Sequence, residues 1–159
     1  NPNPNPNPNP GPNVVLQVYE LGSGTRLADT IRSLNSFTQT ALGAGGVFHV
    51  AEGEGGDVVG FQTVEPFATY THAFDHVGVI GTYVRLDCRR EGVGRALFDA
   101  TFAAARALGY EKLFTFIRKD NSGARAAYGA RGFREIGVAS RQAKVDGVYI
   151  DEIMVEAFL

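Results

Sequence analysis

The sequence predicts a single mixed α/β domain of the α+β type, and three observations support this prediction. Two β-rich runs flank a glycine-rich turn, a strand–helix–strand pattern occupies the centre, and two further β-rich runs lie near the C-terminus. With 159 residues, the chain can bury one hydrophobic core without a disulfide or a structural metal. Two full domains are not expected.

The N-terminal part divides into a tail and the start of the folded domain. Asn and Pro alternate in residues 1–13, and proline removes main-chain donors and biases the preceding residue toward extended conformations. We expect a flexible tail there and a folded domain over residues 14–159. Residues 14–20 predict a strand, and the mostly helical spacing of apolar residues in 25–42 predicts one broken helix or two short ones.

The centre of the chain predicts a hairpin followed by a βαβ unit. Residues 47–65 carry two β-rich runs around GEGGD, whose glycines suit a turn with positive φ. Residues 66–76 then predict a loop. A strand at 77–86, an alanine-rich helix at 93–109 and a strand at 112–118 complete the unit.

The C-terminal part predicts a short helix and a second hairpin. Residues 121–130 form the helix, which Gly132 closes. Residues 133–140 and 147–158 are then two strands around a turn near residue 146.

Composition excludes several classes of partner. The chain is 44% hydrophobic and 20% charged, and no apolar run approaches the roughly 20 residues of a membrane span. The net charge of -2 gives no overall attraction to nucleic acid. Cys88 is the single cysteine, and the N-terminus lacks the pattern of a secretory signal. We therefore expect a cytoplasmic protein that binds neither membrane nor nucleic acid.

The stretch RREGVGRALF at residues 89–98 places Gly92 and Gly94 at the start of the predicted helix. A helix N-terminus has free N–H groups and a positive dipole end, and glycines let this backbone approach an anion closely. Arginines are concentrated around the motif, at Arg85, Arg89, Arg90 and Arg95. Arg85 and Arg95 could equally belong to a solvated face, but the pattern favours a local anion site near Arg90.

Two nucleotide-binding motifs do not fit this stretch. A P-loop requires Lys and then Ser or Thr after its last glycine, where this chain has Arg95 and Ala96. A dinucleotide fingerprint requires a small residue where Leu97 stands, and an acidic residue closing a second strand further on.

The pattern Arg-x-x-Gly-x-Gly, formed by Arg89, Gly92 and Gly94, resembles the acyl-CoA pyrophosphate loop of the GNAT superfamily of N-acetyltransferases. The later segment DNSGARAAYGARGF is similar to the Asn-x-x-Ala-x-x-x-Tyr pattern of that family followed by Gly-Phe. The resemblance covers residues 47–159 and implies a mixed, mostly antiparallel sheet with flanking helices. The end DGVYIDEIMVEAF is similar to the last strand of the branch of amino-acid and phosphinothricin acetyltransferases.

The sequence also departs from this family. The segment between Tyr19 and Val47 is short beside that branch, which leaves the acceptor open. Some relatives carry a catalytic carboxylate where this chain has Val79, which leaves the base open.

The resemblance implies acetyl-CoA as cosubstrate and no metal. It places the pyrophosphate on a loop and pairs the pantetheine with a strand edge. The implied loop residues are Arg89, Arg90, Glu91, Gly92, Val93, Gly94 and Arg95, and the implied edge residues are Thr82, Tyr83 and Val84.

Asn121 and Tyr128 lie seven residues apart, so on a helix they share one face about 10 Å apart. Asn121 either contacts the cofactor or caps its helix, a role open also to Asp120. The resemblance implies that Tyr128 protonates the leaving thiolate as a general acid with a pKa near 10; the alternative is that it only packs against the sheet.

A base must accept the proton of the acceptor amine. Glu65 is the first candidate, with Asp75 and His76 behind it, although all three also suit ordinary loop or strand-end positions. His72 and His76 have a zinc-like spacing, but their segment predicts no helix and the metalloprotease glutamate is missing. Cys88 is interpreted as a small filler residue rather than a nucleophile.

The sequence thus favours an acetyl-CoA-dependent N-acetyltransferase in which the primary amine of a small molecule or amino acid attacks the thioester directly. Acceptor and cofactor would meet where the strand carrying Val84 splays from 112–118. A protein N-terminal or lysine acetyltransferase and a non-catalytic acyl-CoA sensor remain open. Relatives are often dimers, so a homodimer is possible.

Overall fold

The structure, a computed structural model, describes residues 17–20, 46–53 and 56–159. The predicted tail at 1–13 and the predicted helical segment at 25–42 lie outside these residues, as does the beginning of the first predicted strand.

The described residues form seven strands, two α-helices and two 3-10 turns. In chain order these are β1 (Gln17–Glu20), β2 (Val47–Glu52), β3 (Val58–Pro66), η1 (His72–Phe74), β4 (Val77–Val84), η2 (Leu86–Cys88), α3 (Val93–Ala107), β5 (Lys112–Arg118), α4 (Ser122–Gly129), β6 (Arg134–Val145) and β7 (Val148–Phe158).

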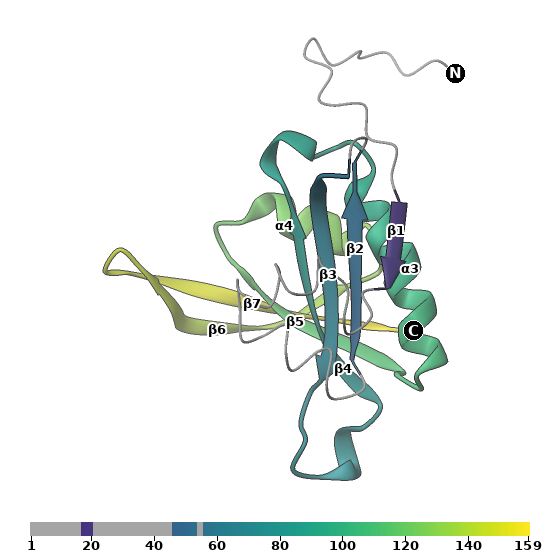
Figure 1. The fold of residues 1–159 in the computed structure, drawn as a ribbon. Coiled ribbons are helices and arrows are strands. Elements are labelled where there is room, and N and C mark those ends of the chain that lie inside the picture. Colours follow the sequence, from purple (N-terminus) through teal and green to yellow (C-terminus); the bar gives the residue numbers. More distant parts are fainter. Residues whose placement is uncertain (1–16, 21–45, 54–55) are drawn as a thin grey trace.

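The strands make one mixed sheet in the order β1-β2-β3-β4-β5-β7-β6 (Figure 1). Among the described strands, β4 and β5 are the one parallel pair, and the other neighbours are antiparallel. The predicted fold class is confirmed. None of the described helices combines the length and the apolarity that a membrane crossing requires.

The predicted hairpin over residues 47–65 is confirmed as β2 and β3. Val47 pairs with Val64, and Gly56 in the turn has a φ of +83°, a value that glycine adopts without strain. Val47, Val50 and Val64 are fully buried. Continuous burial of this kind identifies β2 and β3 as central strands, which explains their β-branched composition.

The predicted βαβ unit is also confirmed, with α3 connecting β4 to the parallel β5. The buried residues of α3 follow helical spacing and include Val93, Leu97, Thr101 and Ala105. This face packs against β2 and β3. A helix over this half of the sheet fixes the direction in which its N-terminus points.

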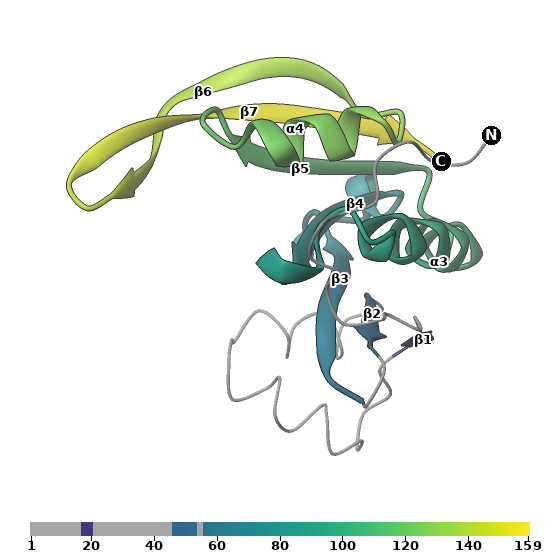
Figure 2. The same ribbon diagram turned by 90° about the horizontal axis from the view of Figure 1, so that it is seen from above.

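The sheet splits between β4 and β5. Their pairing covers only residues 77–79 of β4 and 112–114 of β5. Beyond Val79 the two strands diverge, so the β1–β4 half and the β5–β7 half run in different directions, as Figure 2 shows from above. The predicted splay between the strand carrying Val84 and residues 112–118 is therefore present.

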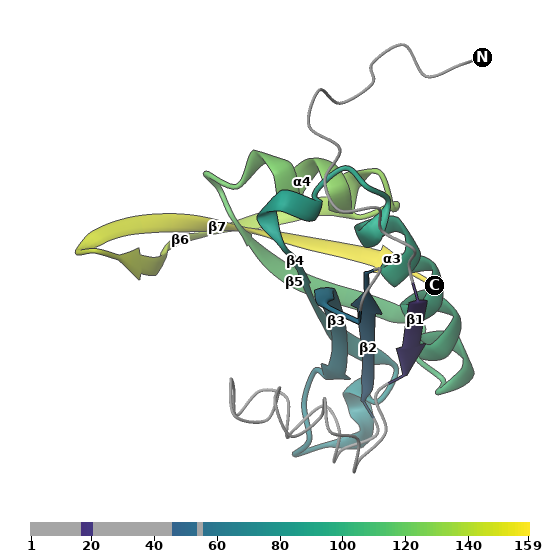
Figure 3. The ribbon, with the colours of Figure 1, turned by 45° about the horizontal axis from the view of Figure 1, so that its top comes forward.

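The C-terminal hairpin is longer than predicted. β6 continues past residue 140 because Arg141 adopts a left-handed φ of 55° and its N–H bonds Asp151 Oδ1 at 2.9 Å, which lets the chain pass through a bulge. The turn at Asp146 (φ 49°) and Gly147 (φ 81°) closes the hairpin as expected. Figure 3 shows the hairpin projecting from the rest of the molecule.

The main core lies between the sheet and the two helices. It includes Val64, Ile80, Phe98, Leu113, Tyr128, Phe133 and Ile153. Full burial of each large apolar side chain contributes about 1.5–3 kcal/mol. The loop at 66–76 is confirmed except for the single 3-10 turn of η1.

Candidate active site

One edge of β4 is bonded to β3 at alternate residues. The Arg85 N–H donates to the Val59 carbonyl at 2.9 Å, and the Phe67 N–H donates to the Val77 carbonyl at 3.0 Å. Main-chain groups alternate between hydrogen-bonded and non-bonded positions along an antiparallel pair. The odd-numbered residues of β4 therefore bond β3, and the even-numbered residues point the other way.

The open edge of β4 is formed by Ile80, Thr82 and Val84, which lie beyond the last pair with β5. An extended ligand can add to such an edge as a further strand. Thr82 and Val84 occupy the positions that the sequence predicted. Tyr83 differs, because its main chain is directed to β3 and its ring stacks on Phe61 with centroids 4.6 Å apart.

A chain of side-chain hydrogen bonds runs along the helix-covered face of the sheet at this opening. The Gln62 amide Nε2 donates to Thr82 Oγ1 at 2.8 Å. Thr82 Oγ1 in turn lies 2.8 Å from Tyr128 Oη. Three elements, β3, β4 and α4, thus converge on one phenolic hydroxyl.

The Tyr128 ring is held in an aromatic cluster. It meets Phe98 of α3 edge to face at 5.2 Å and Phe133 at 4.9 Å between centroids. Burial raises the pKa of Tyr128 to about 12, although the Thr82 hydrogen bond acts in the opposite direction. The ordinary value expected from the sequence is thus corrected, because desolvation disfavours the phenolate. The hydroxyl holds its proton throughout the neutral range.

The glycine motif forms the entry to α3. Arg90 and Gly92 both have left-handed φ angles, 66° and 83°. Gly92 is the N-cap and has no side chain to bond the first turn of the helix. The first N–H groups of α3, at Val93, Gly94 and Arg95, have no intrahelical acceptor. The predicted anion site therefore has the expected main-chain donors.

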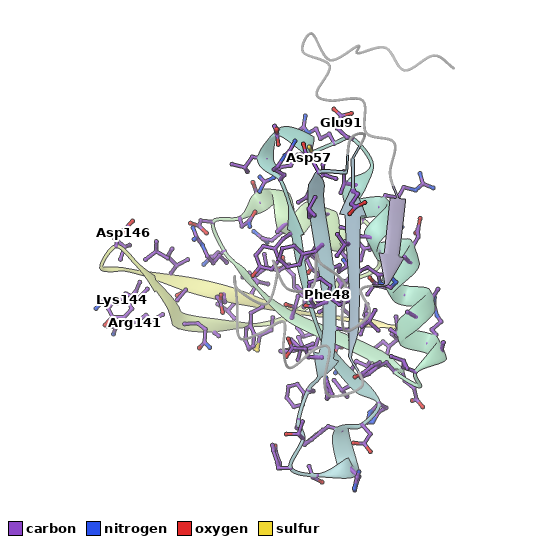
Figure 4. The ribbon with its side chains drawn as sticks, in the orientation of Figure 1. Phe48, Asp57, Glu91, Arg141, Lys144 and Asp146 are labelled. Atoms are coloured by element: carbon purple, nitrogen blue, oxygen red, sulfur yellow. The ribbon has the colours of Figure 1, made fainter. Side chains whose placement is uncertain are left out.

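Neither the backbone conformation nor the packing at position 94 requires glycine. Its φ lies outside the left-handed region, and a Cβ built on it would meet no atom within 4 Å. Arg89 and Arg90 are exposed, and neither takes part in the ion pairs of the described residues. Figure 4 places Glu91 of this loop at the same end of the molecule as Asp57 of the β2–β3 turn.

The opposite face of the sheet carries Glu65. Glu65 pairs directly with Val79, which pairs with Phe114, so these three positions form a row where the β4–β5 pairing ends. Glu65 Oε1 and Thr63 Oγ1 are buried without a hydrogen-bond partner among the described residues. Partial burial raises the pKa of the Glu65 carboxyl above its ordinary value of 4.5. A carboxylate therefore stands one strand away from position 79.

Aromatic rings continue this row toward the loop at 66–76. Phe114 contacts Phe67 at 5.9 Å and Phe116 at 5.1 Å, and Phe67 contacts Phe74 at 5.4 Å. Phe67 is 43% exposed and Phe116 is 40% exposed. The same loop encloses a hollow of about 300 Å³, lined by Pro66, Ala68, Thr69, Tyr70, Thr71, His72 and Asp75.

Asn121 is the N-cap of α4. Its Oδ1 accepts a hydrogen bond from the Ala124 N–H at 3.1 Å. It precedes the first helical residue and is exposed, so the expectation of one helical face shared with the buried Tyr128 is corrected. Asp120 is not the cap, because Arg118 holds it at 2.6 Å. A contact of Asn121 with the cofactor remains a prediction.

The remaining candidates separate from the site. Cys88 is fully buried beside Val93, and burial raises the pKa of its thiol, which disfavours a reactive thiolate. His72 Nδ1 lies 2.9 Å from Asp75 Oδ2 in an exposed pair. The described residues contain no group of three side chains arranged for a metal ion.

Sequence reasoning missed Gln62 and Thr63. Both interrupt the apolar run of β3, and both are almost fully buried, at 0% and 1% exposure. Buried polar side chains inside a central strand require a partner or a function, and this was the signal that could have found them.

Known proteins resemble this chain in sequence and in fold. The pattern of the acetyltransferase (GNAT) family matches residues 18–133. The chain is 30% identical over 103 residues to YwnH of Bacillus subtilis (strain 168), whose name describes a candidate phosphinothricin acetyltransferase, and the match covers 65% of this chain. The chain spans 63% of the length of YwnH.

Two further relatives bear on the fold and the chemistry. The aminoglycoside N(6')-acetyltransferase type 1 of Stenotrophomonas maltophilia is 34% identical over 105 residues, covering 64% of this chain and 69% of that protein. The phosphinothricin acetyltransferase of Sinorhizobium meliloti, solved in complex with AcCoA, has a similar fold with a TM-score of 0.77 at 20% identity, over 91% of this chain and 88% of that one. The chain therefore belongs to the acetyltransferase (GNAT) family.

Proposed function

We propose that this protein is an acetyl-CoA-dependent N-acetyltransferase that acts on the primary amine of a small molecule or amino acid. The observation that carries the proposal is the position of the Tyr128 hydroxyl, 2.8 Å from Thr82 Oγ1 on the open edge of β4. A proton donor thus stands where the two halves of the sheet separate.

The residues present fit acetyl-CoA. Val93, Gly94 and Arg95 offer N–H groups at the N-terminus of α3, where a phosphate binds favourably. Gly94 leaves open the space that a Cβ would fill, although neither its backbone nor its packing requires glycine. Arg89 and Arg90 add positive charge at the same loop.

Each residue group has a distinct task. Acetyl-CoA, when bound, supplies a thioester that a neutral amine can attack. The open edge at Thr82 and Val84 holds an extended arm by main-chain bonds. Tyr128 holds a proton for the leaving sulfur, and its pKa of about 12 keeps that proton in place at neutral pH.

Glu65 is the proposed base. Its raised pKa and its orphaned oxygen Oε1 suit a carboxylate that accepts a proton from an amine. The aromatic rings beside it and the hollow at the 66–76 loop, which is lined by both polar and apolar residues, offer space for a small acceptor. The names of YwnH and the Stenotrophomonas enzyme describe small-molecule acceptors.

Calorimetric titration of acetyl-CoA tests the cofactor site without knowledge of the acceptor. We expect binding, and we expect Arg90→Ala to weaken it by about tenfold, the loss of one charge-assisted contact. Arg106→Ala is the matched control, because Arg106 lies in the last turn of the same helix. Absence of binding would contradict the proposal.

A screen of primary amines and peptides with acetyl-CoA then identifies the acceptor class. Release of free CoA thiol with amino acids or small amines supports the proposal. Acetylation confined to peptides would support a protein acetyltransferase instead. Binding of acetyl-CoA without turnover of any amine would favour the acyl-CoA sensor.

A further inference from the structure

We propose that Gln62 and Thr82 are positioning residues whose hydrogen-bond chain stabilises the Tyr128 phenolate as that side chain gives up its proton. This inference rests on the proposed function, since it concerns the proton donor of the same site. It adds to the site a hydrogen-bond chain that begins inside β3 and ends at the phenolic oxygen.

The contact between Gln62 and Thr82 has a direction set by its donor group. The Gln62 Nε2 amide group can only donate, so Thr82 Oγ1 accepts at that contact, 2.8 Å away. A hydroxyl has one proton, and the Thr82 proton is thereby left for another acceptor. Tyr128 Oη lies 2.8 Å away, and either oxygen of this pair can donate while the phenol is neutral.

The hydrogen bonds from Gln62 and Thr82 stabilise Tyr128 most after it has given up its proton. A neutral phenol can either donate to Thr82 or accept from it, but a phenolate can only accept. The arrangement therefore gives the charged product a hydrogen bond that its neutral form does not require. Hydrogen bonds to a charged oxygen are stronger than those to a neutral one, and each bond in a chain polarises the next.

The two ends of the hydrogen-bond chain are buried, whereas Thr82 between them is half-buried at the open edge. Gln62 is 0% exposed, and Tyr128 is 6% exposed. Gln62 and Thr82 are also direct cross-strand partners, so the pairing of β3 with β4 fixes their separation. The rings of Phe98 and Phe133 hold the tyrosine from the other side.

The proton balance of the step is simple. The amine nitrogen forms a bond to the acyl carbon and loses one proton to the base, and the C–S bond of the thioester breaks. The Oη–H bond of Tyr128 breaks as an S–H bond forms on the departing CoA sulfur. The phenolate accepts the Thr82 hydrogen bond until it regains a proton from solvent, which has received the proton of the acceptor amine through the base.

The first test measures the phenol directly and requires no acceptor. Difluorotyrosine, a more acidic tyrosine, is incorporated at position 128, and its titration is followed by fluorine NMR. Thr82→Val, which keeps the shape but removes the hydroxyl, is expected to raise the phenol pKa by about one unit. Thr82→Ser restores the hydroxyl and is expected to restore the original value. Gln62→Met is expected to give a smaller rise.

Thr101→Val is the matched control. Thr101 is fully buried, whereas Thr82 is half-buried, and like Thr82 it uses its hydroxyl in a side-chain bond, here to His49 Nδ1 at 3.0 Å. Thr101→Val makes the same threonine-to-valine exchange and also loses a side-chain hydrogen bond, but it does not affect the Gln62–Thr82–Tyr128 hydrogen bonds. The phenol pKa is therefore expected to stay unchanged. An unchanged titration in Thr82→Val would overturn the proposal, even if Gln62→Met fails to fold.

The second test uses turnover with the best amine of the screen. Thr82→Val is expected to lower kcat about tenfold with the KM for acetyl-CoA within twofold, and Thr82→Ser to recover the rate. The Tyr128→Phe and Thr82→Val double variant is expected to be no slower than Tyr128→Phe alone. If the losses of kcat in the two single variants add in the double variant, Thr82 does not act through Tyr128 and the proposal is wrong. Absence of turnover in the unchanged protein contradicts the proposed function. The phenol titration still tests whether Thr82 and Gln62 stabilise the Tyr128 phenolate.

Discussion

The two faces of β3 and β4 treat their polar side chains differently. On the helix-covered face, Gln62, Thr82 and Tyr128 are joined by two hydrogen bonds of 2.8 Å. On this face Gln62 Oε1 is the one buried side-chain oxygen without a partner among the described residues, whereas on the opposite face both Thr63 Oγ1 and Glu65 Oε1 lack one. The hydrogen bonds of the first face hold the Tyr128 hydroxyl in place, whereas two buried oxygen atoms of the second face have unused hydrogen-bonding capacity.

Strand alternation makes this division possible. Successive residues of one strand point to opposite faces, so Gln62 and Thr63 serve different faces although they are neighbours in sequence. The split between β4 and β5 then gives a ligand access to the main chain between the faces. The proposed proton donor Tyr128 and the proposed base Glu65 therefore lie on different faces and do not bond each other.

The largest expected effect comes from the helix-covered face. Tyr128→Phe keeps the aromatic packing with Phe98 but removes the proton, so we expect kcat to fall by about 10² or more while acetyl-CoA still binds. Steady-state kinetics and calorimetry check the two parts. Tyr149→Phe, on the exposed hairpin, is the control. Full activity of Tyr128→Phe would exclude Tyr128 as the proton donor, and with it the assignment of donor and base to different faces.

The opposite face is tested by Glu65→Gln. Because burial raises the Glu65 pKa, the acid limb of the pH–rate profile should lie above pH 4.5 in the unchanged protein. The amide cannot accept a proton, so we expect the rate to fall about thirtyfold, within the range for a positioned base, and the limb to disappear. An unchanged profile would exclude Glu65 as the base.

The same carboxyl makes stability depend on pH. Its folded pKa is above its unfolded value, so the folded state binds the proton more tightly, and the free energy of unfolding decreases as pH rises through this window. Glu65→Gln should lack this decrease. Urea unfolding at several pH values measures the difference.

The proposed phosphate site at the N-terminus of α3 is tested at the glycine loop. Gly94→Ala meets no atom and no positive φ, so we expect stability to be unchanged or higher by up to about 1 kcal/mol, with about tenfold weaker acetyl-CoA binding from lost close approach of a phosphate. Gly109→Ala is the contrast, because its φ of +91° should cost about 1 kcal/mol of stability without affecting binding. Thermal unfolding and calorimetry separate the two. Equal binding by Gly94→Ala would contradict the phosphate role.

The smallest effect compares two buried threonines. Thr63→Val replaces an unpartnered hydroxyl and should leave stability unchanged or slightly higher, whereas Thr101→Val breaks the bond to His49 and should cost about 1 kcal/mol. Chemical unfolding of both variants measures the difference. A comparable loss at both positions would mean that Thr63 is held as firmly as Thr101.

Local sequence patterns predicted the elements of the described fold well. Gly56 in one turn, and Asp146 and Gly147 in the other, predicted the two hairpins. Few residue types adopt a positive φ without strain, so these turns can be found from sequence. The length of β6 was missed because the bulge at Arg141 depends on Asp151 of the partner strand. Contacts between strands are not visible in the spacing of one strand.

The site was predicted in part for the same reason. The glycine loop is local in sequence, so Gly92 and Gly94 could be found from the motif. The chain from Gln62 to Tyr128 joins residues separated by 20 and 46 positions. Its existence depends on strand register, and the raised pKa of Tyr128 depends on burial that only the packed core creates.

The projecting β6–β7 hairpin offers a practical handle on this protein. Its exposed turn at Asp146 and Gly147 lies with Arg141 and Lys144 at the far end of the hairpin (Figure 4). Exposed hairpin tips accept insertions because little packing depends on them. A peptide tag introduced there would tether the molecule to a surface through the hairpin, and a fluorophore would report from a site away from the opening between β4 and β5.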